Sequence, residues 1–309
     1  TPTEGAITYI TGLNGKVRTQ TEILNELKTS YGTEIADPTI LTEWVEYLQA
    51  TVKIAIPEVI SYLHTLDNTV VKSSDITTAL NASAYGNLDL TEDELVEFVN
   101  HEHTKDATLN VKIVNAKALE YLTGLTGVRA SSDIRSRLII SEDYNKLELT
   151  DKKLLEFVKT IPNNNVKIVN DEAIEYLRGL EANVIASETI KNLLKSDEKY
   201  NKLELGETEL LGFIEDWNKE QTDKKIEARI VKDKVVGYLK GLENCIRTIT
   251  EINTEVEKDP YNFTFTDEEL KGFRKEWNDE HTEDETQQIR VKIATTDAED
   301  YVRGLNGKV

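Results

Sequence analysis

Apolar side chains recur along this chain in blocks that repeat in the same order. Each block opens on a β-branched run with an outward Lys or Arg, as in Val111-Lys112-Ile113-Val114. This alternation predicts an edge strand. Apolar positions at helical spacing follow, as in Ala173, Tyr176, Leu177 and Leu180. Their spacing of i, i+3, i+4 and i+7 predicts an amphipathic helix.

The rest of each block predicts a short helix, a strand and a longer helix. The short helix follows a predicted Ser or Thr cap at Thr21, Ser132, Ser187 and Thr250. The strand is predicted from alternating residues at Leu88/Leu90, Leu147/Leu149, Leu203/Leu205 and Phe263/Phe265. The longer helix starts with capping boxes at Thr91 to Glu94 and Thr266 to Glu269.

Two tyrosine markers give the period of the repeat. The pattern Tyr, aliphatic, any, small, Leu starts at Tyr9, Tyr62, Tyr121, Tyr176, Tyr238 and Tyr301. A second pattern, Tyr followed by Gly or Asn, starts at Tyr31, Tyr85, Tyr144, Tyr200 and Tyr261. Both markers recur every 53 to 63 residues. Two markers that keep the same phase indicate tandem modules.

We therefore predict an α+β protein, an elongated tandem array of five similar small modules and a partial sixth. Each module has three helices and short strands. The predicted modules are residues 1–51, 52–110, 111–165, 166–227 and 228–288, and residues 289–309 form a partial module or an inter-subunit segment. The predicted structural core comprises Tyr62, Tyr121, Tyr176, Tyr238, Phe98, Phe157, Phe213 and Phe273.

The two ends of the chain resemble each other. Tyr9 to Val17 reads YITGLNGKV and Tyr301 to Val309 reads YVRGLNGKV, identical at seven of nine positions. Either the chain is an excerpt from a longer repetitive polypeptide, or its terminal segment packs on the next subunit head to tail. For the second case, the predicted assembly residues are Tyr9, Leu13, Tyr301 and Leu305.

Composition narrows the function classes. The formal net charge is −20 over 309 residues, which argues against nucleic-acid binding because phosphate neutralisation needs clustered Lys and Arg. No apolar run reaches the roughly 18 residues that span a bilayer, so we expect no membrane insertion. Methionine is absent and there is one cysteine. A chain with so little oxidisable sulfur suits an exported protein, and we expect an extracellular or cell-surface location.

Calcium is the first candidate ligand, since carboxylates and Asn carbonyls are hard oxygen donors. The loop Asn81 to Glu92 has Gly at its sixth position and Glu at its twelfth, as an EF-hand loop does. Its first, third and fifth positions are Asn, Ser and Tyr, which departs from the acidic pattern. Asn81, Asp89 and Glu92 are the candidate ligands, and an ordinary helix-strand-helix turn with caps is the alternative.

Other chemistry has little support in the sequence. His101 and His103 are two residues apart, so they do not share a helix face, and scattered surface histidines are the simpler interpretation. Cys245 is interpreted as a buried packing residue. The nucleophile-elbow, phosphate-loop and zinc-protease motifs do not occur. An active site needs a unique constellation, whereas the distinctive residues here recur, so we expect a protein that is not an enzyme and has no bound cofactor.

These patterns favour a structural protein outside the cell. We expect a segment of a surface layer, filament or adhesin stalk, held together by module-module contacts and by head-to-tail association with itself. The alternative is a repeat binding array for a host protein, a glycan or calcium. A calcium-gated assembly unit is a third hypothesis.

Overall fold

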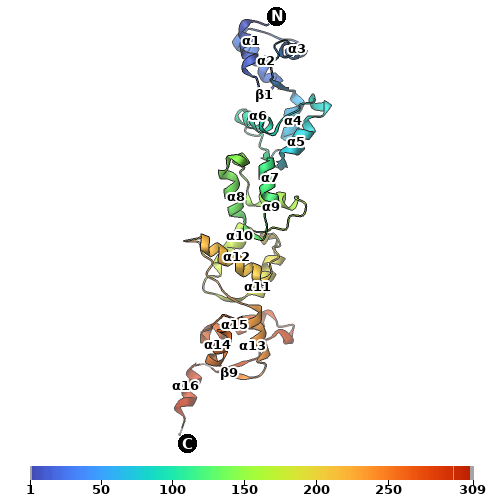
Figure 1. The fold of residues 1–309 in the computed structure, drawn as a ribbon. Coiled ribbons are helices and arrows are strands. Elements are labelled where there is room, and N and C mark those ends of the chain that lie inside the picture. The colour runs from blue at the N-terminus through green and yellow to red at the C-terminus, as the bar shows by residue number, and fades with distance from the viewer. Residues whose placement is uncertain (1, 295, 307–309) are drawn as a thin grey trace. The chain divides into compact units, whose positions relative to one another are not determined.

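The structure, a computed structural model, describes residues 2–294 and 296–306 and divides the chain into two compact units (Figure 1). Unit 1 comprises residues 1–126 and 131–165, and unit 2 comprises residues 127–130 and 166–309. In both units, helices alternate with three-residue strands that pair two by two in parallel. The α+β class predicted from the sequence is thereby confirmed.

The elements of unit 1 follow one another in a repeating order. They are α1 (Glu4–Gly12), β1 (Val17–Thr19), α2 (Gln20–Tyr31), α3 (Thr39–Tyr47), β2 (Lys53–Ala55), α4 (Pro57–Thr65), β3 (Val70–Lys72), α5 (Ser73–Leu80), the 3-10 helix η1 (Ser83–Tyr85), α6 (Glu92–Lys105), β4 (Lys112–Val114), α7 (Ala116–Thr123), α8 (Ser131–Ile140), η2 (Glu142–Tyr144) and α9 (Asp151–Lys159).

Unit 2 continues this order. Its elements are β5 (Val128–Ala130), β6 (Lys167–Val169), α10 (Asp171–Gly179), β7 (Val184–Ala186), α11 (Ser187–Ser196), η3 (Glu198–Tyr200), α12 (Glu207–Glu220), β8 (Arg229–Val231), α13 (Asp233–Gly241), β9 (Ile246–Thr248), α14 (Ile249–Val256), α15 (Asp267–Glu280), η4 (Glu285–Gln287), β10 (Lys292–Ala294) and α16 (Thr296–Gly304).

Each sheet consists of two parallel strands that are far apart in the sequence. In the first sheet Val17 pairs with Lys53, and α2 and α3 lie between the two strands along the chain. A parallel pair requires such a crossover, which the two helices provide. The predicted β-branched runs form the second strand of each pair. The first strand of each pair was not predicted, and these missed strands are β1, β3, β5, β7 and β9.

A sheet in unit 2 shows how consecutive modules are joined. In β7, Val184 and Ala186 pack in the hydrophobic core of α13, α14 and α15, whereas Ile185 packs against the core of α10, α11 and α12. Successive side chains of a strand point to opposite faces. The sheet therefore lies between two cores and contributes to both.

The first sheet of unit 1 has the same arrangement. Val17 and Ala55 lie in the core of α4, α5 and α6, whereas Val52 and Ile54 pack in the core of α1, α2 and α3. The strands that pair come from either side of the predicted boundary at residues 51 and 52. Consecutive modules thus share a sheet instead of being joined by a linker alone.

The two tyrosine markers form a single contact. The rings of the first five first-marker tyrosines lie 5.2 to 5.8 Å, centroid to centroid, from the ring of the second-marker tyrosine that follows each of them. The pairs are Tyr9 with Tyr31, Tyr62 with Tyr85, Tyr121 with Tyr144, Tyr176 with Tyr200 and Tyr238 with Tyr261. This contact accounts for the nearly constant separation, 22 to 24 residues, between the two tyrosines of each pair.

The residue after each second-marker tyrosine ends a helical turn in the left-handed conformation. Gly32 ends α2 with φ of 59°, and Asn145 and Asn201 end η2 and η3 with φ of 51° and 58°. Gly adopts this conformation freely, and Asn does so more easily than other side chains. The restriction of this position to Gly and Asn therefore has a backbone cause.

Two local predictions need correction. The predicted caps fall in the first turn of their helices, because the last strand residue is the cap: Thr19 and Thr248 accept from backbone N–H groups of α2 and α14. The alternating pairs such as Phe263/Phe265 belong to no strand. The Asn253 side chain hydrogen-bonds both backbone groups of Phe265, at 2.8 and 2.9 Å, so these groups are satisfied without a strand partner.

The predicted core residues divide into two classes. Phe98, Phe157, Phe213 and Phe273 are buried. Tyr62, Tyr121, Tyr176 and Tyr238 are half-buried at the margin of the core, each against its partner tyrosine. Placing the phenol at the margin leaves its hydroxyl near water. The helical capping boxes at Thr91 and Thr266 form as predicted.

Candidate functional site

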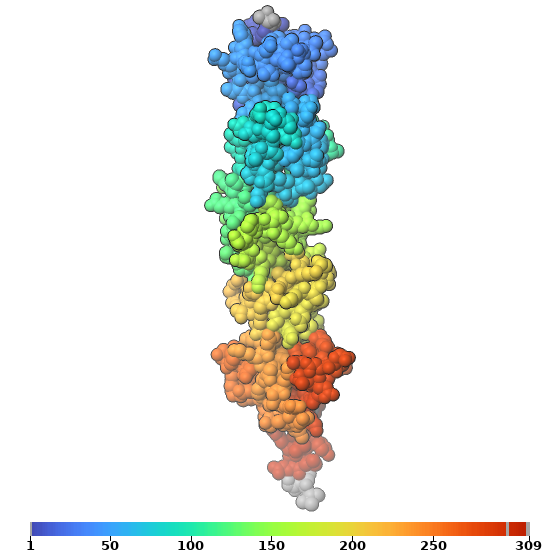
Figure 2. Space-filling view, turned by 90° about the vertical axis from the view of Figure 1, so that its right-hand side faces the viewer, coloured from blue at the N-terminus to red at the C-terminus, as the bar shows by residue number. Residues whose placement is uncertain are grey.

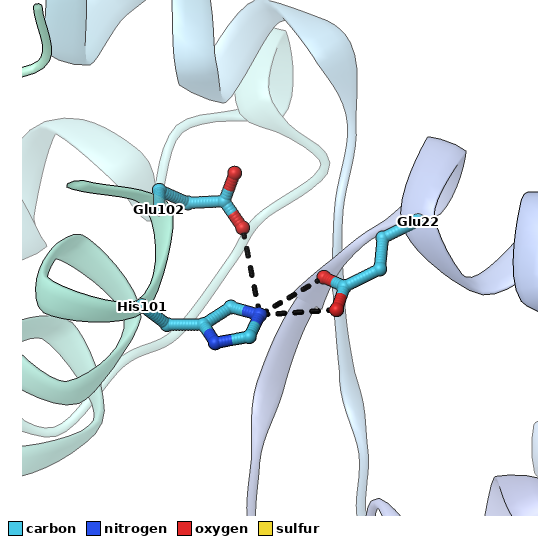
Figure 3. Close-up of side chains that lie close together, drawn as sticks. All are labelled: Glu22, His101 and Glu102. Atoms are coloured by element: carbon cyan, nitrogen blue, oxygen red, sulfur yellow. Dashed lines mark hydrogen bonds and ion pairs between the residues drawn. The ribbon is translucent and has the colours of Figure 1, made fainter. Parts of the chain in front are cut away.

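Polar side chains gather where α2 of the first module meets α6 of the second, within unit 1. Figure 3 shows Glu22 from the first turn of α2 facing His101 and Glu102 from the last turns of α6. His101 Nε2 lies 3.0 Å from Glu22 Oε1 and 4.0 Å from Glu102 Oε1. The histidine ring therefore bridges two modules.

These three side chains have the donor set of a metal site. Their ligand atoms all lie within 4.8 Å of one another, and imidazole nitrogen with carboxylate oxygen suits zinc. However, Lys105 Nζ lies 2.5 Å from Glu22 and 3.0 Å from Glu102. The lysine ammonium already supplies a positive charge between the two carboxylates, so a metal ion would have to displace it.

The charge of Glu22 depends on these neighbours. Burial by itself would raise the pKa of Glu22, but hydrogen bonds from Lys105 and His101 outweigh it and hold that pKa below its ordinary value. The carboxylate is therefore ionised at neutral pH. The cluster is best described as an ion-pair network between modules.

Arg18 adds a second ionic contact at the same junction. Its side chain is almost completely buried, and its guanidinium donates two hydrogen bonds, of 2.9 and 3.0 Å, to the carboxylate of Glu97 on α6. Burial would lower the pKa of Arg18, but the hydrogen bond and charge of Glu97 raise it above its ordinary value. A bidentate pair of this kind fixes the register of the two modules as well as their distance.

The equivalent helices also meet in unit 2. Thr189 on α11 occupies the position of Glu22, and its hydroxyl lies 2.8 Å from the carboxylate of Glu280 on α15. One hydrogen bond there takes the place of the ionic network around Glu22. The geometry of the junction is thus repeated, whereas its chemistry differs between the two units.

A buried serine forms a second recurring contact. In the second module, Ser73 at the start of α5 donates to Glu92 at the start of α6. The same carboxylate accepts the backbone N–H of Ala116, the first residue of α7, at 2.8 Å. Glu92 therefore connects three helix starts, where negative charge is favourable.

The serine contact recurs in unit 2 with an added lysine. Ser187 Oγ lies 2.6 Å from carboxylates of both Glu207 and Asp233, and Glu207 also accepts the backbone N–H of Asp233. Burial would raise the pKa of Asp233, but hydrogen bonds from Lys191 and Ser187 hold it below its ordinary value. Ser187 is therefore a bridging residue instead of the predicted helix cap.

A pocket of about 730 Å³ lies beside the Glu92 contact in unit 1. It is lined by apolar groups of Val114 and Leu119, and by polar groups of Ser73, Thr77 and Glu120, among others. Its size is within the range of small-molecule pockets.

The three candidate calcium ligands, Asn81, Asp89 and Glu92, have different surroundings. Asn81 is exposed at the end of α5, and the backbone carbonyl of Asp89 accepts a hydrogen bond from Lys53. Glu92 is engaged with Ser73 and the start of α7.

His103, His101 and Cys245 lie in separate environments. His103 Nδ1 lies 2.8 Å from the Leu109 carbonyl, so it does not act together with His101. His101 is not a scattered surface histidine, because Glu22 and Glu102 enclose it. Cys245 is partly exposed, in contrast to the buried packing role predicted for it. It precedes β9, where its carbonyl accepts from Lys292 at the sheet edge.

The predicted assembly residues lie in contrasting environments. Leu13 is buried with α1 in the first core, and Tyr9 packs against that core on Tyr31. Tyr301 on α16 and Leu305, which follows this helix, are exposed. Helix α16 extends beyond the last sheet of unit 2 (Figure 1), and Figure 2 shows the surface of this end of unit 2 in red. Residues 307–309 of the repeated end segment lie outside the described residues.

The sequence patterns missed the ionic residues of the junction. The ion pairs that cross this junction join residues 79 or more positions apart in the sequence, and no local spacing connects them. These pairs are Arg18 with Glu97 and Glu22 with Lys105. Aligning the modules would have found one signal, because Val17-Arg18-Thr19 and Ile246-Arg247-Thr248 occupy the same place in the repeat.

Among the described residues, no helix combines the length and apolar character needed to cross a membrane. Comparison of the chain with protein-family models, with curated proteins and with solved structures gave no significant match.

Proposed function

We propose that this chain is an extracellular structural repeat protein, a segment of a surface layer, filament or adhesin stalk, with no catalytic role. The observation that carries the proposal is the shared sheet. In unit 1 the β1–β2 sheet contributes to two consecutive cores, and in unit 2 the β7–β8 sheet does the same. Neighbouring modules joined in this way keep a fixed spacing, which is what a structural element requires.

The ionic junction supports the same role. Arg18 and Glu22 bind Glu97, His101 and Lys105 across the first two modules, so sliding of one module on the other would break several charge-assisted bonds at once. The net charge of −20 keeps unassembled chains apart through mutual repulsion. The absence of methionine suits an oxidising environment outside the cell.

Imaging and localisation of the native protein test this proposal. Electron microscopy of material from the producing cells should show periodic fibres or a lattice, and antibodies should label the outside of intact cells. Labelling confined to the cell interior, together with dispersed particles at native concentration, would refute the structural role.

The second candidate function is a repeat binding array for a host protein, a glycan or calcium, and the pocket of about 730 Å³ between the second and third modules, within unit 1, favours it. Glycan-array binding by the full chain that is lost on Leu119→Trp, which fills the pocket wall, would support this function. Calcium binding predicts a large fall in melting temperature on chelation. An unchanged melting curve would remove calcium from the list of ligands.

A further inference from the structure

The pocket of about 730 Å³ in unit 1 lies between the second and third modules. Helix α5 of the second module contributes Ser73 and Thr77 to its lining, and α7 of the third module contributes Leu119 and Thr123. Val114, at the end of β4, adds a further apolar group. The pocket is thus a gap between two helices that belong to consecutive modules.

Three ionisable side chains also line the pocket: Glu92, Glu120 and Lys72. Glu92 Oε2 accepts hydrogen bonds from the Ser73 hydroxyl and from the backbone N–H of Ala116. Glu120 and Lys72 form no ion pair within the described ranges. Two carboxylates and one ammonium leave the lining with a formal charge of −1. A ligand with a single positive charge complements it.

The junction between the fourth and fifth modules, in unit 2, has the same polar frame. Ser187 and Glu207 hold the positions of Ser73 and Glu92 at the starts of their helices. The same two hydrogen bonds form there, from Ser187 to Glu207 and from the backbone N–H of Asp233 to Glu207. The two junctions can therefore be compared side chain by side chain.

Two differences between the junctions explain why there is a gap in unit 1. Where α5 has Thr77, α11 has Lys191, and each directly follows a fully buried isoleucine. Where α7 begins with Ala116, α13 begins with Asp233. Lys191 Nζ lies 2.8 Å from Asp233 Oδ2, and the lysine side chain is only 19% exposed. The butylammonium group of Lys191 thus spans from α11 to α13, where Thr77 and Ala116 leave space.

We propose that the pocket of unit 1 binds a small aliphatic primary amine, with its ammonium beside Glu92 and its alkyl chain against Leu119 and Val114. The ligand takes the place that the side chain of Lys191 takes in unit 2. The carboxylate supplies a charge-assisted hydrogen bond, and the apolar lining removes the methylene groups from water. This activity is separate from the structural role proposed above. It gives the pocket a ligand that is neither a glycan nor calcium.

NMR titration of the isotope-labelled full-length chain tests the proposal. The probe is n-butylammonium chloride at constant ionic strength, because this cation copies the side chain of Lys191. Saturable chemical-shift changes should appear in α5 and α7, with a dissociation constant of the order of 1 mM, since so small a ligand gains limited free energy. Butan-1-ol has the same alkyl chain without the charge, and it should bind at least about tenfold more weakly. Equal binding of the alcohol would overturn the proposal, as would amine-induced shifts that do not saturate.

Charge variants test the part of the lining that recognises the ammonium. Glu92→Gln should raise the dissociation constant of the amine at least about tenfold, because the amide keeps an acceptor for the N–H of Ala116 but loses the charge. Lys72→Gln should lower this constant several-fold, because it removes a like charge from the lining. Glu58→Gln and Lys234→Gln make the same changes at exposed residues outside the pocket, and they should have no effect. Amine binding that is insensitive to both pocket variants would contradict the proposal.

Exchanging the two differing side chains tests the comparison between the junctions. Thr77→Lys supplies an ammonium from the chain itself and should abolish amine binding. Conversely, Lys191→Thr combined with Asp233→Ala should create a second site, seen as saturable shifts in α11 and α13, while Ser187 keeps Glu207 as its partner. Melting curves identify the variants that fold. Amine binding retained in folded Thr77→Lys, or no second site in the folded double variant, would refute the assignment. Neither result bears on the structural role, which fails only on the imaging and localisation described above.

Discussion

Replacing Val17 by Ala should destabilise a module that does not contain Val17. Its side chain is fully buried in the core of α4, α5 and α6, although β1 lies in the module before. The substitution removes two buried methyl groups, worth about 0.8 kcal/mol each. The cavity left behind adds to this loss, and we expect a total of about 2–3 kcal/mol. That is a large fraction of the stability of a small domain.

Native-state hydrogen exchange is the assay, because it reports stability segment by segment. In Val17→Ala, amides of α5 and α6 should exchange faster by the factor that corresponds to about 2–3 kcal/mol. Ile246→Ala is the matched control: Ile246 holds the same strand position but is 67% exposed, so the monomer should change by less than about 0.5 kcal/mol. If Val17→Ala left α5 and α6 unchanged, the reasoning from the shared sheet would be wrong.

Three further predictions concern single side chains. Phe98→Ala should cost about 3–5 kcal/mol, because Phe98 is fully buried, and an unchanged thermal melt by circular dichroism would contradict this. Burial would raise the pKa of Glu22, but Lys105 and His101 lower it below its ordinary value. The stability that the Glu22 carboxylate contributes is therefore complete above the ordinary pKa of Glu, and it is lost as the pH falls through the lower pKa of the folded protein. Urea unfolding from pH 7 to 3 should show less acid destabilisation in Glu22→Gln, and equal slopes would refute the network. Burial, with the charges of Glu22 and Glu26, raises the pKa of Tyr9 to about 12 from 10, so the stability from its neutral phenol is lost as the pH rises from about 10 to 12. Titration at 295 nm should lose one late step in Tyr9→Phe.

Much of the helical architecture was predictable because its signals are local. The capping boxes at Thr91 and Thr266 involve residues three apart, and both form in the structure. The phenylalanines at helical spacing are buried. The Gly or Asn after the second-marker tyrosine reports a left-handed backbone, which depends on that residue itself. Each of these features needs only the neighbouring residues of the chain.

Strand assignment failed where the pattern and the hydrogen bonding disagree. Phe263 and Phe265 alternate as strand residues do, yet an asparagine side chain satisfies the backbone of Phe265. The strands β1 and β9 contain three residues each and include a central arginine. Three residues are too few to establish a period of two.

The amino-acid sequence by itself predicted the α+β class, most of the helices and the buried phenylalanines, because these follow from spacings within a few turns of the chain. Only the tertiary structure decided which strands pair and that one sheet contributes to two cores. It also decided that Arg18 meets Glu97. These contacts join residues dozens of positions apart, and their energy depends on burial, which no local spacing records.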